Sequence, residues 1–317
     1  MHALPSPMNS TIVRSAVALG WTRARFALAA ALAPESALEA AARRFLSPPR
    51  IPHSDREKRA LATGRGFAVA TPAGRVAAWS FGPGDRPAVV LSHGWGGRGA
   101  QLRAFVGPIV DAGWQAVLFD HPAHGLSEGH ESSLVHFERA LAAVAADLES
   151  RGIPVAGAIG HSLGAAAIGA WLNRSARTTR AVLIAPPHSI ERYSGLFARA
   201  IGIPEVIRRG MQERIERSLG VAWQRYELPQ SVASIRAPAL VVHDAHDREV
   251  GAASGLAIAR AWPGARFLST SGLGHRAIVR DPGVVRDAID FLAGEVVFAP
   301  PPAHDEWSAF PGPAPLL

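Results

Sequence analysis

The chain has no cysteine and no long uncharged apolar run. Without cysteine, no disulfide supports the fold, and nothing in the sequence indicates an oxidising compartment. The apolar stretch 11–32 contains Arg14, Arg23 and Arg25, so no part of it reaches the roughly 20 apolar residues that span a bilayer. A signal peptide carries its charges before the apolar run rather than within it. We therefore expect a cytoplasmic protein whose stretch 11–32 forms an amphipathic helix, lying on the rest of the protein or on a membrane surface.

Lysine is almost absent as well. Lys58 is the only lysine among 33 lysines and arginines, so arginine carries nearly all of the positive charge behind the net charge of +7. Basic chains can bind nucleic acid, but here the arginines are dispersed and no recognition motif accompanies them. We expect no nucleic-acid partner. A weak association of the basic N-terminal helix with anionic lipid, or a preference for acidic substrates, remains open.

The most informative motif is Gly160-His161-Ser162-Leu163-Gly164. It follows the apolar run 155–159 and precedes the alanine-rich run 165–172. A strand, G-x-S-x-G and a helix in this order predict a nucleophile elbow, a sharp turn that projects the serine hydroxyl at the carboxyl edge of a sheet. Larger side chains two places on either side of the serine would collide, which explains the two glycines. The helix N-terminus also favours negative charge that develops beside Ser162.

A nucleophilic serine needs a base, and the base needs an acid that orients it. A predicted buried strand, 238–242, ends in a polar loop that contains Asp244 and Asp247. The next predicted strand leads to His275. Serine, aspartate and histidine in this order form one of the known chain orders of a catalytic triad. The ordered set therefore predicts that Ser162 and His275 act with one of the two aspartates.

The electrophilic part of such a site is a pair of backbone N–H groups that bind the oxyanion of the tetrahedral intermediate. One donor is expected to be the amide of Leu163, directly after the nucleophile. The other is expected from the loop His93-Gly94-Trp95-Gly96-Gly97, which follows the apolar run 88–92. Glycines allow the backbone to approach a substrate closely. We select the amide of Trp95 as the second donor.

As an ordered set, these residues resemble an α/β-hydrolase-fold serine hydrolase of the broad esterase, lipase and serine aminopeptidase-like group. The matching segments are 93–96, 120–127, 160–164, 243–250 and 274–275, within about residues 65–293. The family places its acid three residues after a glycine and before a small residue or valine. This implies Asp247, followed by Val250, as the triad acid, although Asp244 replaces the usual glycine. The family's Asp-x-Pro-Gly-x-Gly-x-Ser turn implies that Asp120 braces a loop, with Ala123 replacing the first glycine.

The resemblance implies hydrolysis of a carboxylic ester with a small or medium acyl group through an acyl-enzyme. No metal or organic cofactor is expected, and the partner is a small-molecule acyl substrate. The histidines His93, His121, His124, His130 and His161 do not have the spacing of a helix-borne metal-ligand pair. The alternatives are a thioesterase, an acyltransferase, a perhydrolase, a carbon–carbon bond hydrolase or a non-catalytic binding protein on the same scaffold.

Apolar strands alternate with amphipathic helices along the chain, which predicts an α/β fold with a mostly parallel twisted sheet and helices on both faces. The expected strands are 76–81, 88–92, 115–120, 155–159, 181–185, 238–242 and 265–269. The expected helices between them are 100–112, 133–150, 164–174, 252–262 and 282–292. The expected parts are an N-terminal helical extension and linker (1–60), a hydrolase core (61–187 and 237–293), a short helical lid insertion (188–236) and a Pro-rich disordered tail (294–317). The sequence does not predict the oligomeric state.

Overall fold

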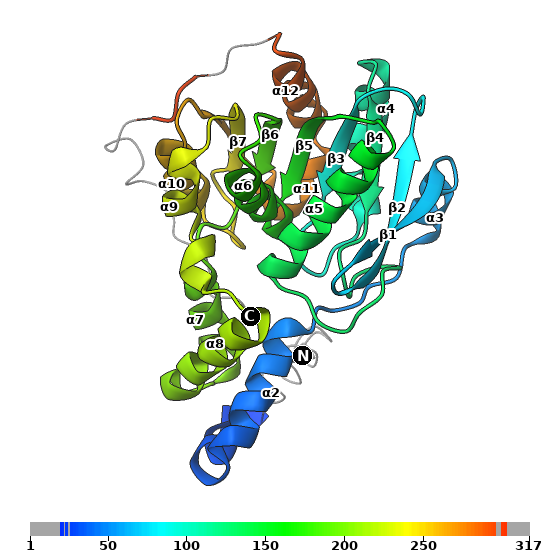
Figure 1. The fold of residues 1–317 in the computed structure, drawn as a ribbon. Helices are drawn as coiled ribbons and strands as arrows, with labels where there is room; N and C mark the ends of the chain where they lie inside the picture. The colour runs from blue at the N-terminus through cyan, green and yellow to red at the C-terminus, as the bar shows by residue number, and fades with distance from the viewer. Residues whose placement is uncertain (1–19, 22, 25, 296–298, 303–317) are drawn as a thin grey trace, which may run out of the picture. The chain divides into compact units, whose positions relative to one another are not determined.

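A computed structural model describes residues 20–21, 23–24, 26–295 and 299–302 of the chain (Figure 1). Most of the predicted C-terminal tail, and residues 11–19 of the predicted N-terminal helix, lie outside the described residues. The chain divides into two compact units. Of the described residues, the larger unit, here the core unit, contains 47–190 and those from 224 onwards. The smaller unit, here the helical unit, contains those from 20 to 46 and 191–223.

The core unit is built on an eight-stranded sheet within the described residues, with the order β1-β2-β4-β3-β5-β6-β7-β8 (Figure 1). The strands are β1 Arg65–Thr71, β2 Gly74–Phe81, β3 Ala88–Ser92, β4 Gln115–Phe119, β5 Val155–His161, β6 Arg180–Ile184, β7 Ala239–Asp244 and β8 Arg266–Thr270. β2 pairs antiparallel with both β1 and β4, and the remaining pairs are parallel. The predicted, mostly parallel sheet is therefore confirmed.

The strand β1 was not predicted from the sequence. This strand lies at the edge of the sheet, and most of its residues are exposed or half-buried, so it lacks the continuous apolar run of the central strands. It is joined to β2 by a tight turn in which Gly74 has a φ of 106°, a conformation that glycine adopts readily.

Helices cover both faces of the sheet (Figure 1). The helices of the core unit are α3 Asp55–Leu61, α4 Val106–Asp111, α5 Leu134–Ser150, α6 Leu163–Ser175, α9 Leu228–Ser231, α10 Ala253–Ala261, α11 Gly274–Ala277 and α12 Pro282–Ala293, with 3-10 turns at Gly99–Phe105, Val232–Ser234 and Ile278–Arg280. The expected helix 100–112 is a 3-10 segment followed by α4. Pro108 lacks an N–H group, so it is tolerated only in the first turn of an α-helix, and α4 begins two residues before it.

The core unit begins at residue 47, earlier than the predicted boundary at 61. Its first helix, α3, has a capping box in which the Ser54 side chain accepts from the Glu57 amide and Glu57 accepts from the Ser54 amide. The same Glu57 carboxylate is buried and lies 2.8 Å from the guanidinium of Arg98. These contacts tie α3, most of which falls within the predicted N-terminal extension 1–60, to the core.

The helical unit contains α2 Pro34–Leu46, α7 Ile190–Ile201 and α8 Glu205–Leu219, with α7 starting at the unit boundary. α2 packs on α8, where a Cβ atom on Gly210 would lie 2.5 Å from Leu38. The ring of Phe45 lies 5.2 Å from that of Phe197 and 5.4 Å from that of Trp223. The N-terminal segment therefore packs on the insertion, a partner that the sequence pattern did not indicate.

Within the described part of the chain, none of the helices combines the length and the hydropathy that a membrane span requires.

Candidate active site

Ser162 lies at the turn between β5 and α6. Its backbone has a φ of 53° and a ψ of −122°, a strained conformation for a residue with a side chain. Two sets of hydrogen bonds hold it there. Its amide donates to the carbonyl oxygen of Ile184 on β6 at 2.8 Å, and its own carbonyl oxygen accepts from the amides of Ala165 and Ala166 in the first turn of α6. The serine is thus fixed at the carboxyl end of β5, as the motif predicted.

Both glycines of the motif are required, because backbone atoms of other residues lie too close to them to allow a side chain. A Cβ atom on Gly160 would lie 2.6 Å from the backbone of Ala165, across the turn. A Cβ atom on Gly164 would collide with the carbonyl oxygens of Ser92 and His93 at the end of β3. The first contact is the collision expected from the sequence, whereas the second arises because α6 packs against the end of the neighbouring strand.

His275 and Asp247 are joined by a hydrogen bond. Nδ1 of His275, in α11, lies 2.7 Å from Oδ2 of Asp247, in the loop after β7. Both side chains are buried. The other carboxylate oxygen of Asp247 accepts from the amides of Glu249 and Val250 at 2.8 and 2.9 Å, which fixes the carboxylate in its loop. A carboxylate oxygen can only accept here, so Nδ1–H of His275 donates and Nε2 is the nitrogen left for other contacts.

Asp244, the other candidate acid, has a different set of partners. Its Oδ2 accepts from the Thr270 hydroxyl at 2.9 Å and from the Leu273 amide at 3.0 Å. Its Oδ1 accepts from the His246 amide at 3.0 Å. Asp244 therefore ties the end of β7 to the loop that carries His275, a bracing role that the sequence did not indicate.

The environment of Asp247 favours its charged form. Burial acts to raise the pKa of this carboxyl, but the contacts with His243 and His275 outweigh burial and hold the pKa well below its usual range. Nε2 of His243 donates to the carbonyl oxygen of Val250 at 2.8 Å and lies 3.5 Å from Oδ2 of Asp247. His243 was missed by the sequence analysis. Its position at the end of a buried strand, immediately before the acid loop, is the only signal that the sequence carries.

His161 connects the segment that contains His275 to the nucleophile elbow. Its Nε2–H donates to the carbonyl oxygen of His275 at 2.8 Å, and the two rings lie 4.7 Å apart. Burial, together with the nearby His275, lowers the pKa of His161 to about 3, so the ring is neutral near pH 7. Since His161 directly precedes Ser162, this bond brings the segment of His275 to the elbow.

The loop after β3 lies against Ser162 on another side. A Cβ atom on Gly94 would lie 2.9 Å from the Cβ atom of Ser162, so only glycine allows this approach. Trp95, the next residue, is 39% exposed, and its ring lies 5.5 Å from that of His124. Leu163 is the first residue of α6, where amides lack partners within the helix. The loop of Trp95 and the amide of Leu163 therefore both adjoin Ser162.

Comparison with known proteins agrees with this geometry. The model of the family described as "Serine aminopeptidase, S33" matches residues 84–225, which include the loop after β3 and the elbow. The chain has the α/β-hydrolase fold. Among solved structures, the chain is similar to the Pyrococcus furiosus esterase Pf2001, with 18% identity over 78% of this chain and 99% of that chain and a TM-score of 0.61. A comparison with curated proteins found no match.

Two further solved structures share the fold. Carboxylesterase CesB (YbfK) from Bacillus subtilis is 20% identical over 76% of this chain and 96% of that chain, with a TM-score of 0.54. The putative non-heme bromoperoxidase BpoC from Mycobacterium tuberculosis H37Rv is 22% identical over 70% of this chain and 97% of that chain, also with a TM-score of 0.54. At these identities the likeness establishes the fold.

Three buried histidines connect the loop after β3 to the turn after β4, and we call them the histidine clasp: His93, His121 and His124. Nδ1–H of His124 donates to the carbonyl oxygen of Pro122 at 2.9 Å, which leaves its Nε2 to accept from the Gly96 amide at 3.0 Å. Nδ1–H of His93 donates to the carbonyl oxygen of Gly94 at 2.7 Å, and its Nε2 accepts from the His121 amide at 3.0 Å.

The clasp is made of neutral rings. Burial lowers the pKa of His93 to about 4 and that of His124 to about 3, and it holds the pKa of His121 well below its usual value. The ring of His121 stacks on Phe137 at 3.6 Å. Across the described residues, no three histidine, aspartate or glutamate side chains are grouped as metal ligands. The rings of His93 and His124 bond to backbone, and Nε2 of His121 lies 2.8 Å from the Ser92 hydroxyl.

Asp120 braces the turn after β4, as the sequence predicted. Its Oδ1 accepts from the Gly99 amide at 2.7 Å, and its Oδ2 accepts from the Leu126 amide at 2.9 Å. The ring of His53, from the segment before α3, lies 3.5 Å from Oδ2. Burial acts to raise the pKa of Asp120, but the contact with His53 and the backbone N–H groups outweigh it and lower the pKa.

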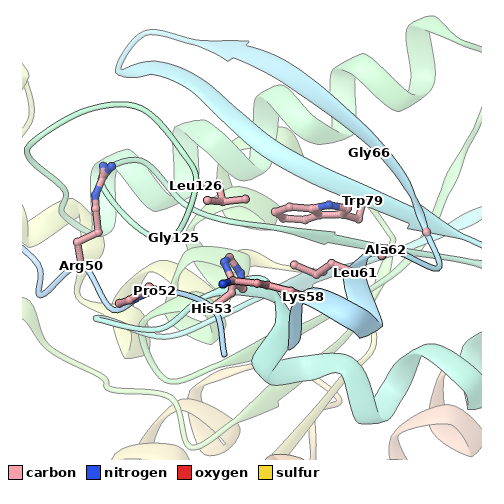
Figure 2. Close-up of a pocket in the computed structure, with 11 residues that line it drawn as sticks. Arg50, Pro52, His53, Lys58, Leu61, Ala62, Gly66, Trp79, Gly125 and Leu126 are labelled. Atoms are coloured by element: carbon pink, nitrogen blue, oxygen red, sulfur yellow. The ribbon is translucent and has the colours of Figure 1, made fainter. Parts of the chain in front are cut away.

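A cavity of about 680 Å³ lies in the core unit between the segment 50–62, the β1–β2 hairpin and the turn at Gly125 and Leu126 (Figure 2). Neither Ser162 nor His275 lines it. Figure 2 shows Trp79 and Leu126 on one side and His53 and Leu61 on the other. The two cations at its rim already have partners: Arg50 donates to the carbonyl oxygens of Ser127 and Gly129, and Lys58 pairs with Asp55.

Proposed function

We propose that the hydrolase cleaves carboxylic esters with small or medium acyl groups through an acyl-enzyme on Ser162. The observation that carries the proposal is the 2.7 Å hydrogen bond between His275 and Asp247, which form a buried pair. His161, which directly precedes Ser162, donates a hydrogen bond to the carbonyl oxygen of His275. The strained backbone of Ser162 supports a nucleophilic role, because such strain occurs preferentially at functional sites.

In the proposed mechanism, Nε2 of His275 takes the proton from Oγ of Ser162 as the oxygen attacks the acyl carbon. Asp247 orients the imidazole and stabilises the imidazolium that forms. The amides of Trp95 and Leu163 donate to the oxyanion of the tetrahedral intermediate. His275 then gives its proton to the leaving alcohol, which departs and leaves the acyl group on the serine. Water, activated by the same imidazole, releases the acid and restores the hydroxyl.

The ester substrate is supported by the names of the neighbours Pf2001 and CesB (YbfK), an esterase and a carboxylesterase. The name of BpoC, a putative bromoperoxidase, supports perhydrolysis as a second candidate, in which hydrogen peroxide attacks the acyl-enzyme in place of water. Thioester cleavage, acyl transfer and carbon–carbon bond hydrolysis use the same nucleophile and remain alternatives.

The test uses p-nitrophenyl esters of graded acyl length, with the wild type and the Ser162→Ala variant. We expect turnover by the wild type and a loss of at least about 10⁴-fold in kcat in the variant, because the nucleophile is removed. A fluorophosphonate should label the wild type at Ser162 and leave the variant unlabelled. Circular dichroism verifies that the variant is folded.

Two results would contradict the proposal. Undiminished turnover by the variant would remove Ser162 from the mechanism. Absence of both turnover and labelling in the wild type would favour a non-catalytic binding protein on this scaffold. A panel of matched esters, thioesters and amides, with and without hydrogen peroxide, separates ester hydrolysis from the other activities.

A further inference from the structure

The helical unit exposes large apolar side chains on its first helix. The described residues from 20 to 32 are helical. Within them, Trp21 is 69% exposed, Leu28 is 61% exposed and Leu32 is 76% exposed. These residues are spaced by seven and four positions, so at 100° per residue they lie within an arc of about 40° around the helix axis. We call them the apolar stripe. Single exposed leucines are common, whereas an aligned set indicates a surface that contacts something apolar.

A different side of this helix is held by α7. The guanidinium of Arg23 donates to the carbonyl oxygens of Arg199 and Ala200, near the C-terminal end of α7, at 3.2 to 3.3 Å. A Cβ atom on Gly202 would lie 2.5 Å from the side chain of Arg23. Arg23 is about 160° around the helix from Trp21. Because these bonds hold the Arg23 side against α7, the apolar stripe is directed away from it.

The helical unit is also strongly basic. Residues 1–46 contain five arginines and two glutamates, and residues 191–223 contain six arginines and four glutamates. These segments therefore carry five of the chain's seven net positive charges. Arginine binds phosphate oxygens in a bidentate manner and is always charged. A partner that complements both the apolar stripe and this positive charge has an apolar interior that is covered by a surface layer of phosphate groups.

We propose that the helical unit binds the surface of an anionic lipid bilayer through the apolar stripe. Trp21, Leu28 and Leu32 enter the boundary between headgroups and acyl chains, with the helix parallel to the membrane plane. The arginines of the unit add an attraction for anionic headgroups that falls as salt rises. Binding of this kind requires no spanning helix. It is independent of the proposed ester hydrolysis, so each proposal can fail without the other.

The test measures co-sedimentation of the full chain with phosphatidylcholine vesicles that contain or lack phosphatidylglycerol. The wild type should bind the anionic vesicles at low salt, and binding should fall steeply as salt rises. A double variant, Leu28→Glu with Leu32→Glu, should bind at least about 100-fold more weakly, since each leucine that no longer enters the bilayer reduces affinity by about tenfold or more. Tryptophan emission should shift to the blue on binding, and the Trp21→Phe variant should lose that shift.

Ala27→Glu is the matched control. Ala27 is exposed on the same helix but lies at least about 100° around the axis from each residue of the stripe. It adds the same type of charge to a different side, so it should reduce binding much less than the double variant. Circular dichroism verifies that every variant remains helical.

Three results would overturn the proposal. The first is that the wild type does not bind anionic vesicles at low salt. The second is that Ala27→Glu weakens binding as much as the double variant does. The third is that the wild type forms dimers without lipid, the double variant is monomeric, and neither binds vesicles. That outcome would assign the stripe to a contact between two copies of the chain.

Discussion

Four buried histidines should make the stability of this protein depend steeply on pH. Burial lowers the pKa of His93 to about 4 and the pKa values of His124 and His161 to about 3, and it holds the pKa of His121 well below its usual value. Each ring is therefore neutral in the folded chain at about pH 5. In the unfolded chain the same rings gain a proton as the pH falls below about 6.5.

The sign of the effect follows from this difference. The unfolded chain binds more protons than the folded chain below about pH 6.5, so the free energy of unfolding is greatest above that pH and falls as the solution becomes more acidic. Between about pH 7 and about pH 5, each such histidine removes about 2 kcal/mol. His93, His124 and His161 together remove about 6 kcal/mol, which is comparable with the whole stability of a typical domain, and His121 acts in the same direction. Asp247 contributes little in this window, because an ordinary aspartate titrates near pH 4.

The assay is urea unfolding followed by circular dichroism across this pH range. The variant His124→Gln removes one titrating ring, so its loss of unfolding free energy between about pH 7 and about pH 5 should be smaller by about 2 kcal/mol. His130→Gln is the control, since His130 is exposed in the folded chain, and its pH dependence should match the wild type. A wild-type free energy of unfolding that stays constant over this range would refute the reasoning.

Three other substitutions test contacts of the core unit. Asp247→Asn should lower kcat for a p-nitrophenyl ester by about 10⁴-fold, because an amide does not hold the required tautomer of His275. Asp244→Asn, the matched change three residues earlier, should lower kcat by less than about tenfold, and equal losses in the two variants would contradict the assignment of the acid. Glu57→Ala should lower the free energy of unfolding in urea by about 3 kcal/mol, since it leaves the mostly buried Arg98 without its carboxylate. An unchanged urea midpoint would show that α3 is not held by this pair.

Segments whose structure depends on local pattern were predicted well. The strand 88–92 has the predicted bounds, and the elbow at Ser162 has the predicted geometry. A buried parallel strand is a continuous apolar run, and an elbow requires glycines at fixed spacing, so both can be read within about ten residues of chain. The edge strand β1 and the helix α3 have weaker local patterns, because each is largely exposed and is defined by its partners.

The order of serine, acid and histidine along the chain was enough to predict an α/β-hydrolase and to select Ser162 and His275 as candidates. Only the tertiary structure decided which aspartate bonds to the imidazole, because Asp244 and Asp247 lie three residues apart in one loop and have equal chemistry. It also decided that His93 and His124 hold backbone as neutral rings, and that α2 packs on α8. These properties are determined by burial and by hydrogen bonds between segments that are tens of residues apart, so they cannot be predicted from the sequence pattern within one segment.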